Sequence, residues 1–96
     1  MVTEHAFIAV LPGAESDFES VLPEALAVLS AAPGCSSVRI LRGVERPSTF
    51  LLLVEWESLA AHTEGFRSSE AFTRWRALIG PYLDGQPEVE HFSPRA

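Results

Sequence analysis

Three side chains in the second half of the chain are suited to proton transfer and anion binding. His62 carries an imidazole that can act as a general base near neutral pH, and Tyr82 offers a phenol for proton transfer. Arg76 lies close in angle to Phe72 and Ile79 on a helical wheel, inside an apolar arc where its guanidinium could hold an anion. Together they predict acid–base chemistry on a small molecule that becomes anionic.

A purely structural interpretation is open for two of these residues. Arg76 can cover the edge of the core with its aliphatic stem and pair with a glutamate. His62 can be a packed or partly solvated residue on the face of a helix. The sequence is compatible with the structural and the functional interpretation of both residues.

Four aromatic residues, Trp56, Phe66, Phe72 and Trp75, are the candidates for substrate binding. The two tryptophans in particular can line a flat pocket between a sheet and its helices. They can equally be ordinary core residues, because a small domain often uses tryptophan to fill its interior.

Motifs for phosphate, metal or acyl chemistry are missing. There is no glycine-rich phosphate loop, no cysteine pair at metal spacing and no Gly-x-Ser-x-Gly elbow. His5 and His91 can approach each other if the first and last strands are neighbours, but histidines at strand ends are usually solvated, so we expect no metal site. Cys35 has no partner for an internal disulfide and is expected to be a packing residue.

The composition is that of one globular domain spanning residues 1–96. The net charge is −6, and the positive charges are all scattered arginines, so nucleic acid is not an expected partner. No stretch is long enough to cross a bilayer, and residues 6–11 do not make a secretory signal. These features predict no membrane association and a cytoplasmic location.

A central strand and the helix after it must position the candidate residues. Residues 50–54 are all apolar and Trp56 follows at strand spacing, so both faces of this strand should be covered. Ser58 can cap a helix that carries His62 and Phe66 on one face. The strand therefore places Trp56 directly beside the start of the next helix.

The remaining elements follow from apolar periodicity and from glycine and proline punctuation. Pro23 should kink the first helix or begin a second segment. The strand over residues 36–44 is mixed in character and is expected at an edge of the sheet. The expected elements are strands over 5–11, 36–44, 50–56 and 88–92, a helix over 15–31, and a helix from about 69 to 80 capped by Ser68 or Ser69.

This order is βαββαβ, the ferredoxin-like arrangement of the α+β class, in which an antiparallel sheet with strand order 4-1-3-2 carries two helices on one face. The other face would expose side chains such as Leu51 and Leu53, more apolar surface than a monomer usually shows to water. A second copy would cover them. We therefore expect a homodimer that closes through the sheet faces.

With these residues placed, the segment VEWESLAAHTEGFRSSEAFTRWRALIGPYL resembles the antibiotic biosynthesis monooxygenase (ABM) family, as do PEVEHF, PGAESDFE and APGC. The resemblance implies a dimeric α/β barrel with a cavity between sheet and helices in each protomer. Several members oxidise phenolic or quinol-like molecules with O2 and without metal or flavin, so no cofactor is expected. Trp56 matches the family's tryptophan at the end of the third strand, and His62 matches a histidine often found after it.

The resemblance also disfavours one activity of the family. Haem-degrading relatives resemble a pattern with an asparagine on the first strand and a haem-ligating histidine on the second long helix. This chain has no asparagine, and Arg76 falls near the place of that histidine. Some monooxygenase relatives also use an asparagine to hold a substrate carbonyl, and this chain lacks it.

Three functional hypotheses follow. The first is a cofactor-independent monooxygenase acting on a hydroxylated aromatic or quinol-like molecule, with His62 or Tyr82 as base and Arg76 holding the anion. The second is a non-catalytic dimeric barrel that binds a small hydrophobic ligand. The third is an isomerase or lyase of the same barrel type, in which the base moves a proton and O2 takes no part. The resemblance favours the first.

Overall fold

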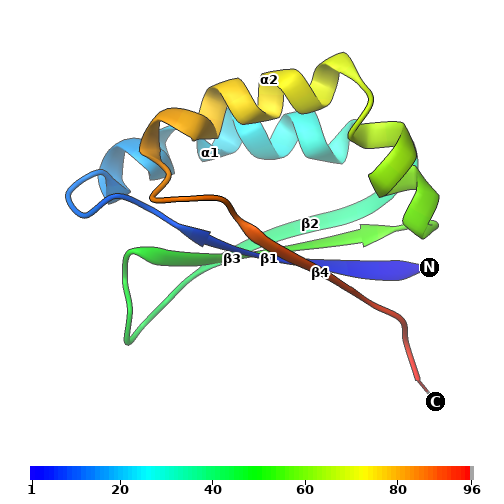
Figure 1. Cartoon of the computed structure of the whole chain (residues 1–96), viewed down its shortest axis with the longest axis horizontal. Coiled ribbons are helices and arrows are strands. Elements are labelled where there is room, and N and C mark those ends of the chain that lie inside the picture. Colours follow the sequence, from blue (N-terminus) through cyan, green and yellow to red (C-terminus); the bar gives the residue numbers. More distant parts are fainter. Residues whose placement is uncertain (96) are drawn as a thin grey trace.

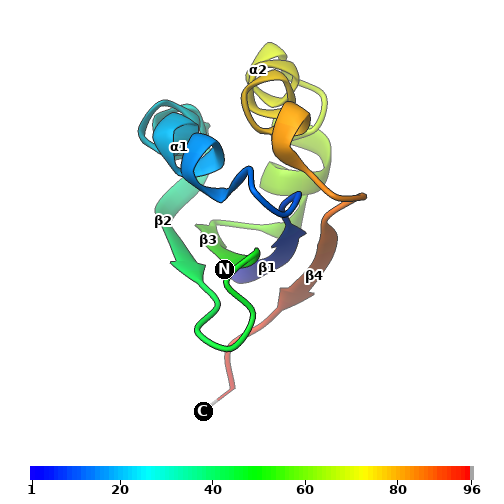
Figure 2. The same ribbon diagram turned by 90° about the vertical axis from the view of Figure 1, so that its left-hand side faces the viewer.

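An antiparallel sheet with two long helices packed on one face makes up the structure (Figure 1 and Figure 2). It is a computed structural model that describes residues 1–95 of the chain. The element order is βαββαβ, which confirms the predicted α+β, ferredoxin-like class. The elements are β1 (Val2–Ala9), α1 (Glu15–Ser30), β2 (Cys35–Arg42), β3 (Thr49–Trp56), the π-helical turn η1 (Ala61–Phe66), α2 (Glu70–Ile79), the 3₁₀ turn η2 (Gly80–Tyr82) and β4 (Glu88–Phe92).

The strands lie in the order β2-β3-β1-β4, and each neighbouring pair is antiparallel. β3 is therefore a central strand and β2 an edge strand, as predicted. The even-numbered side chains from Phe50 to Trp56 point to the helical side and are each at most 2% exposed. The odd-numbered Leu51 and Leu53 point to the other side and are only half-buried.

The bounds of β1 and β2 differ from the prediction. β1 begins at Val2 rather than at residue 5, because its ladder with β3 extends to the pair formed by Val2 and Trp56. It ends at Ala9, and Val10 makes only an isolated bridge to Leu83. β2 likewise ends two residues earlier than predicted, where its ladder with β3 ends.

Helix α1 is continuous through Pro23, so the alternative of a second segment beginning there is wrong. Pro23 lies on the exposed side of the helix, and an interior proline costs roughly 3 kcal/mol. The opposite side buries Phe18, Leu22 and Leu29, and burial of each such side chain stabilises by about 1.5–3 kcal/mol. Packing on the sheet therefore outweighs the proline.

Serine hydroxyls begin both helical segments that follow β3, as predicted. Oγ of Ser58 accepts a 3.1 Å hydrogen bond from the backbone N–H of Ala61, and Oγ of Ser69 accepts a 3.3 Å hydrogen bond from that of Phe72. The first segment is a π-helical turn rather than an α-helix, because the N–H of Arg67 donates to the carbonyl of His62, five residues earlier. Such widened turns are frequent at functional sites.

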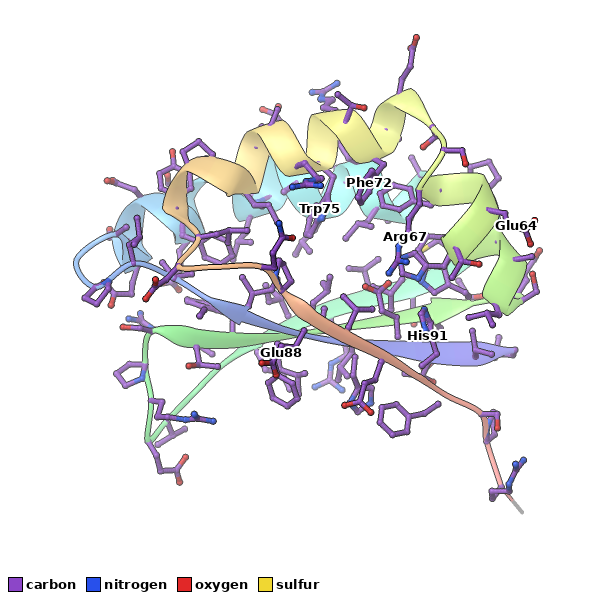
Figure 3. The ribbon with its side chains drawn as sticks, in the orientation of Figure 1. Glu64, Arg67, Phe72, Trp75, Glu88 and His91 are labelled. Atoms are coloured by element: carbon purple, nitrogen blue, oxygen red, sulfur yellow. The ribbon has the colours of Figure 1, made fainter. Side chains whose placement is uncertain are left out.

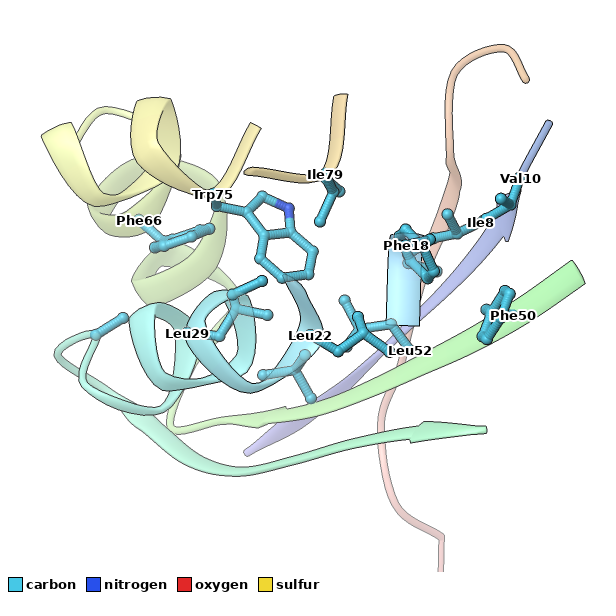
Figure 4. Packing of buried hydrophobic residues seen from close by; sticks show 14 of the residues in the cluster. Ile8, Val10, Phe18, Leu22, Leu29, Phe50, Leu52, Phe66, Trp75 and Ile79 are labelled. Atoms are coloured by element: carbon cyan, nitrogen blue, oxygen red, sulfur yellow. The ribbon is translucent and has the colours of Figure 1, made fainter. Parts of the chain in front are cut away.

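The hydrophobic core lies between the helices and the sheet (Figure 4). The opposite face of the sheet is covered by neither helix (Figure 2). There the register aligns Leu41, Leu51 and Phe7 across three strands, next to Leu53. Phe7 is 44% and Leu41 42% exposed, and we call these four residues the open-face patch.

Within residues 1–95, neither long helix combines the length and the apolar character needed to cross a bilayer. The expected cytoplasmic location and the homodimer stay predictions.

Candidate functional site

A cavity of about 550 Å³ lies between the sheet, η1 and α2. That volume suits a small organic molecule. The apolar side chains Ala6, Ile8 and Leu52 form its floor on the sheet. The loop between α2 and β4, including Gly85 and Pro87, forms part of its lining.

Three aromatic side chains line the cavity on the helical side. Phe66 comes from η1, and Phe72 and Trp75 come from α2. The rings of Phe66 and Phe72 meet edge to face at 5.6 Å, and Figure 3 shows Phe72 and Trp75 pointing from α2 towards the sheet. These residues make an apolar slot suited to a flat ring.

A buried carboxylate also lines the cavity. Glu4 is 5% exposed, because it occupies the same face of β1 as the core residues Ala6 and Ile8. Its Oε1 accepts a 3.0 Å hydrogen bond from Nε1 of Trp56. Burial raises the pKa of the Glu4 carboxyl, and the Trp56 hydrogen bond and the positive charge of Arg67 oppose that rise.

His62 is buried beside Glu4. Its Nε2 lies 3.4 Å from Oε1 of Glu4, and its Nδ1 lies 2.7 Å from Nε2 of His91. Burial, followed by the charges of Arg67 and His91, lowers the pKa of His62 to about 4. The imidazole is therefore neutral at neutral pH, and its contact with Glu4 is not an ion pair there.

Two arginines, Arg67 and Arg76, supply positive charge to the cavity. Within residues 1–95, neither forms an ion pair, whereas Arg74 on the outer side of α2 pairs with Glu24 at 3.0 Å. The guanidinium of Arg76 lies 5.7 Å from the centroid of the Phe72 ring. The glutamate-paired interpretation of Arg76 is thus not observed, and its charge is available to a ligand.

The structure brings five of the seven predicted site residues to the cavity and leaves two outside its lining. Trp56 is fully buried behind the wall, where it stacks on His62 at 5.0 Å with 14° between the ring planes. Tyr82 lies in η2 and packs edge-on against Phe18 at 6.5 Å. The residues at the cavity are His62, Phe66, Phe72, Trp75 and Arg76.

The pairing of His5 with His91 that the sequence raised for a metal ion is wrong. The register pairs His91 with Glu4 and His5 with Glu90, so the two imidazoles project from opposite faces of the sheet. His5 contacts Phe92 on the outer face, with ring centroids 4.4 Å apart. No cluster of three or more metal-ligating side chains occurs in the described part of the chain, residues 1–95.

Sequence reasoning missed Glu4, Arg67 and the contact of His91 with His62. A usable signal existed for Glu4, which alternates in phase with Ala6 and Ile8 on a strand otherwise apolar on that face. For His91 the decisive fact is strand pairing, which no local pattern contains.

Comparison with known proteins places the chain in a family. The family model described as antibiotic biosynthesis monooxygenase (ABM) matches residues 1–78. The chain belongs to the ABM family. The resemblance noted from the sequence is thereby confirmed.

Similar proteins align with nearly the whole chain. YczJ of Bacillus subtilis (strain 168), an uncharacterised protein, is 38% identical over 92 residues, which are 96% of this chain and 97% of YczJ. A crystal structure from Bordetella bronchiseptica, of a protein whose name assigns it to the ABM family, is 36% identical with a TM-score of 0.94, over 99% of this chain and 97% of that one. SnoaB of Streptomyces nogalater, a cofactor-independent oxygenase, shares the fold at 21% identity with a TM-score of 0.81, over 99% and 93% of the two chains.

Proposed function

We propose that this ABM protein is a cofactor-independent monooxygenase that oxidises a hydroxylated aromatic or quinol-like molecule with O2 in the cavity beneath α2. The observation that carries the proposal is the joint presence of a buried carboxylate, an aromatic slot and two arginines around one volume of about 550 Å³, with no ion pair to either arginine among residues 1–95. A deprotonated phenol or quinol is electron-rich enough to reduce O2 itself. The protein then needs a base, an anion stabiliser and dry walls.

Glu4 is the base in this proposal, in place of His62 or Tyr82. A general base works best when its pKa lies near the working pH. Burial raises the pKa of Glu4 in that direction, whereas it lowers the pKa of His62 to about 4, which makes His62 a weak base. Tyr82 lies outside the cavity lining, so this proposal gives it no role.

Arg67 and Arg76 stabilise the anion that forms when the substrate loses its proton. Both line the cavity and neither is neutralised by a carboxylate within residues 1–95. Both arginines are exposed, so water screens part of their charge until a bound substrate covers them. Phe66, Phe72 and Trp75 hold the ring of the substrate by apolar and stacking contacts.

A homodimer that closes through the open-face patch is part of the proposal. The patch places Leu41, Leu51 and Phe7 side by side on a sheet face that neither helix covers. Contiguous apolar surface of this kind marks an interaction site, and a two-fold pair of identical patches is self-complementary. The cavity lies on the other side of the sheet, so each copy keeps its own site.

Oxygen uptake tests the proposed reaction. The purified protein, treated with chelator and free of flavin, is expected to consume O2 with at least one member of a panel of quinols, anthrones and naphthols. Glu4→Gln keeps the shape and an acceptor for Trp56 but removes the base, so uptake should fall by roughly a hundredfold or more. Turnover by Glu4→Gln at the wild-type rate would remove Glu4 from the mechanism.

The same measurement separates the alternatives. The Glu4 carboxylate could also move a proton within a substrate, so conversion under argon would identify an isomerase or lyase. If no panel member is converted but one raises the melting temperature, the protein is a binding barrel. Neither result is compatible with the oxygenase proposal.

A further inference from the structure

A series of polar contacts leads from the cavity to the edge of the sheet. Oε1 of Glu4 lies 3.4 Å from Nε2 of His62, and Nδ1 of His62 lies 2.7 Å from Nε2 of His91. Glu4 and His62 line the cavity. His91 lies on the edge strand β4 and is only half-buried (Figure 3). The two imidazoles thus connect an enclosed carboxylate to a side chain that water can reach.

Several contacts hold this arrangement in one geometry. β1 and β4 pair Glu4 directly with His91 in the sheet. The ring of Trp56 stacks on His62 while its Nε1 donates to Glu4. The His62 ring is therefore clamped with one nitrogen towards the carboxylate and the other towards the second imidazole. Preorganisation of this kind is what proton transfer between fixed groups requires.

The charges around these three residues disfavour storage of a proton on either imidazole. Arg67, which follows η1, is the positive group that acts on Glu4, His62 and His91 alike. Cys35 at the start of β2 is the titratable group that interacts with Glu4 from the other side. Within residues 1–95, no carboxylate other than Glu4 lies within 4.0 Å of His62 or His91. Burial and the positive charge of Arg67 therefore disfavour the doubly protonated form of either imidazole.

We propose that Glu4, His62 and His91 form a proton relay between the cavity and solvent at β4. In the outward direction a substrate O–H bond breaks and an O–H bond forms on Glu4. That bond then breaks as Nε2 of His62 gains a proton, while Nδ1 of His62 passes its proton to Nε2 of His91. Nδ1 of His91 releases one proton to water, so each transfer conserves a single proton and needs no further reactant.

The relay resets by running in reverse. One outward passage leaves both imidazoles in the opposite tautomer, and an inward passage restores them. This alternation suits an oxygenase, which first removes a proton from its substrate and later gives one to reduced oxygen. The 3.4 Å step between Glu4 and His62 is longer than a strong hydrogen bond, and catalytic contacts of this kind often tighten when substrate binds.

The relay rests on the proposed function for its substrate, but its resting geometry can be tested without one. In protein carrying isotope-labelled histidine, a scalar coupling is expected across the hydrogen bond between His62 Nδ1 and His91 Nε2, whichever of the two nitrogens donates. The coupling should vanish in His91→Ala and persist in His5→Gln, a control on the opposite face of the sheet. Absence of the coupling in the wild type overturns the relay, whatever the activity.

Turnover provides the second test. His91 touches no substrate, so His91→Ala should lower kcat by about tenfold or more at unchanged KM, and added imidazole should restore the rate. His91→Gln still hydrogen-bonds to His62 but cannot relay a proton, so it should be equally slow and not rescued. Wild-type kcat in both variants overturns the relay and leaves the oxygenase proposal standing. If the wild type takes up no O2, the proposed function is overturned. The scalar coupling between the two histidines then tests the relay on its own.

Discussion

The indole Nε1 of Trp56 donates a 3.0 Å hydrogen bond to the buried carboxylate of Glu4, across the neighbouring strands β3 and β1. Trp56 is fully buried and Glu4 is 5% exposed, so this bond forms where water cannot replace it. A tryptophan that sequence reasoning treats as a wall of the cavity therefore acts from behind the wall. Its hydrogen bond stabilises the Glu4 carboxylate.

Removal of that hydrogen bond should be costly. In Trp56→Phe the buried carboxylate loses a donor, and we expect a loss of about 1–3 kcal/mol in the free energy of unfolding at neutral pH. The pKa of Glu4 should rise further, because the Trp56 hydrogen bond lowers it. Urea denaturation of Trp56→Phe, Glu4→Ala and the double variant measures the coupling, because each single substitution removes the hydrogen bond. Strictly additive effects of the two substitutions would contradict this account.

The depressed pKa of His62 predicts a pH dependence of stability. Its pKa is about 4 in the folded protein against 6.5 ordinarily, so between these values the unfolded chain binds more protons. The free energy of unfolding should therefore fall as the pH drops through this window, by on the order of 2 kcal/mol after allowance for partial solvent contact. Denaturation across pH should show this component in the wild type and not in His62→Gln. Identical pH profiles would refute it.

Arg67 should control the protonation of both relay histidines. Burial lowers the pKa of His62 and of His91 most, and the charge of Arg67 lowers both further. In Arg67→Gln both values should move up, towards the ordinary range for histidine, and the pKa of Glu4 should rise as well because a stabilising positive charge is lost. Titration followed by NMR measures all three. The opposite direction for the histidines would show that Arg67 does not face them in solution.

Arg76 has a matched control two positions earlier on α2. Arg76 lines the cavity, whereas Arg74 pairs with Glu24 on the outer surface. Arg76→Ala should lower kcat/KM by roughly tenfold to a thousandfold, because it removes a charge aimed at the developing anion. Arg74→Ala should change kcat/KM little. Equal effects of the two substitutions would assign Arg76 a structural role.

The open-face patch predicts the oligomeric state. Leu51→Glu places a charge in the middle of the row formed by Leu41, Leu51 and Phe7 and should convert a dimer to a monomer. Leu59→Glu, at a side chain that is 48% exposed, is the control and should stay dimeric. Light scattering after size exclusion gives the mass of each. A monomeric wild type would rule out the interface.

The fold is largely predictable because its signals are local. The apolar run from Phe50 to Val54 identifies the central strand, and Ser58 and Ser69 mark the helical starts by forming caps. The ends of β1 are not predictable in this way, because strand partners rather than local preference determine them. The continuity of α1 through Pro23 is likewise decided by packing on the sheet.

The site is predictable only on its helical side. Phe72, Trp75 and Arg76 reach the cavity because helical periodicity fixes the face from which they project. Tyr82 lies beyond the end of α2, where that periodicity no longer applies. Glu4 and His91 meet through the pairing of the first and last strands, a contact between distant parts of the sequence that no local pattern reveals.

The cavity lies under the helices, and the open-face patch lies on the other side of the sheet. In a pair joined back to back, the two reaction chambers would point outward, each with its own entrance and its own exit for protons. Ligand saturation should then be hyperbolic, without cooperativity. The two protomers would work as independent units that share only the stabilising interface formed by their open-face patches.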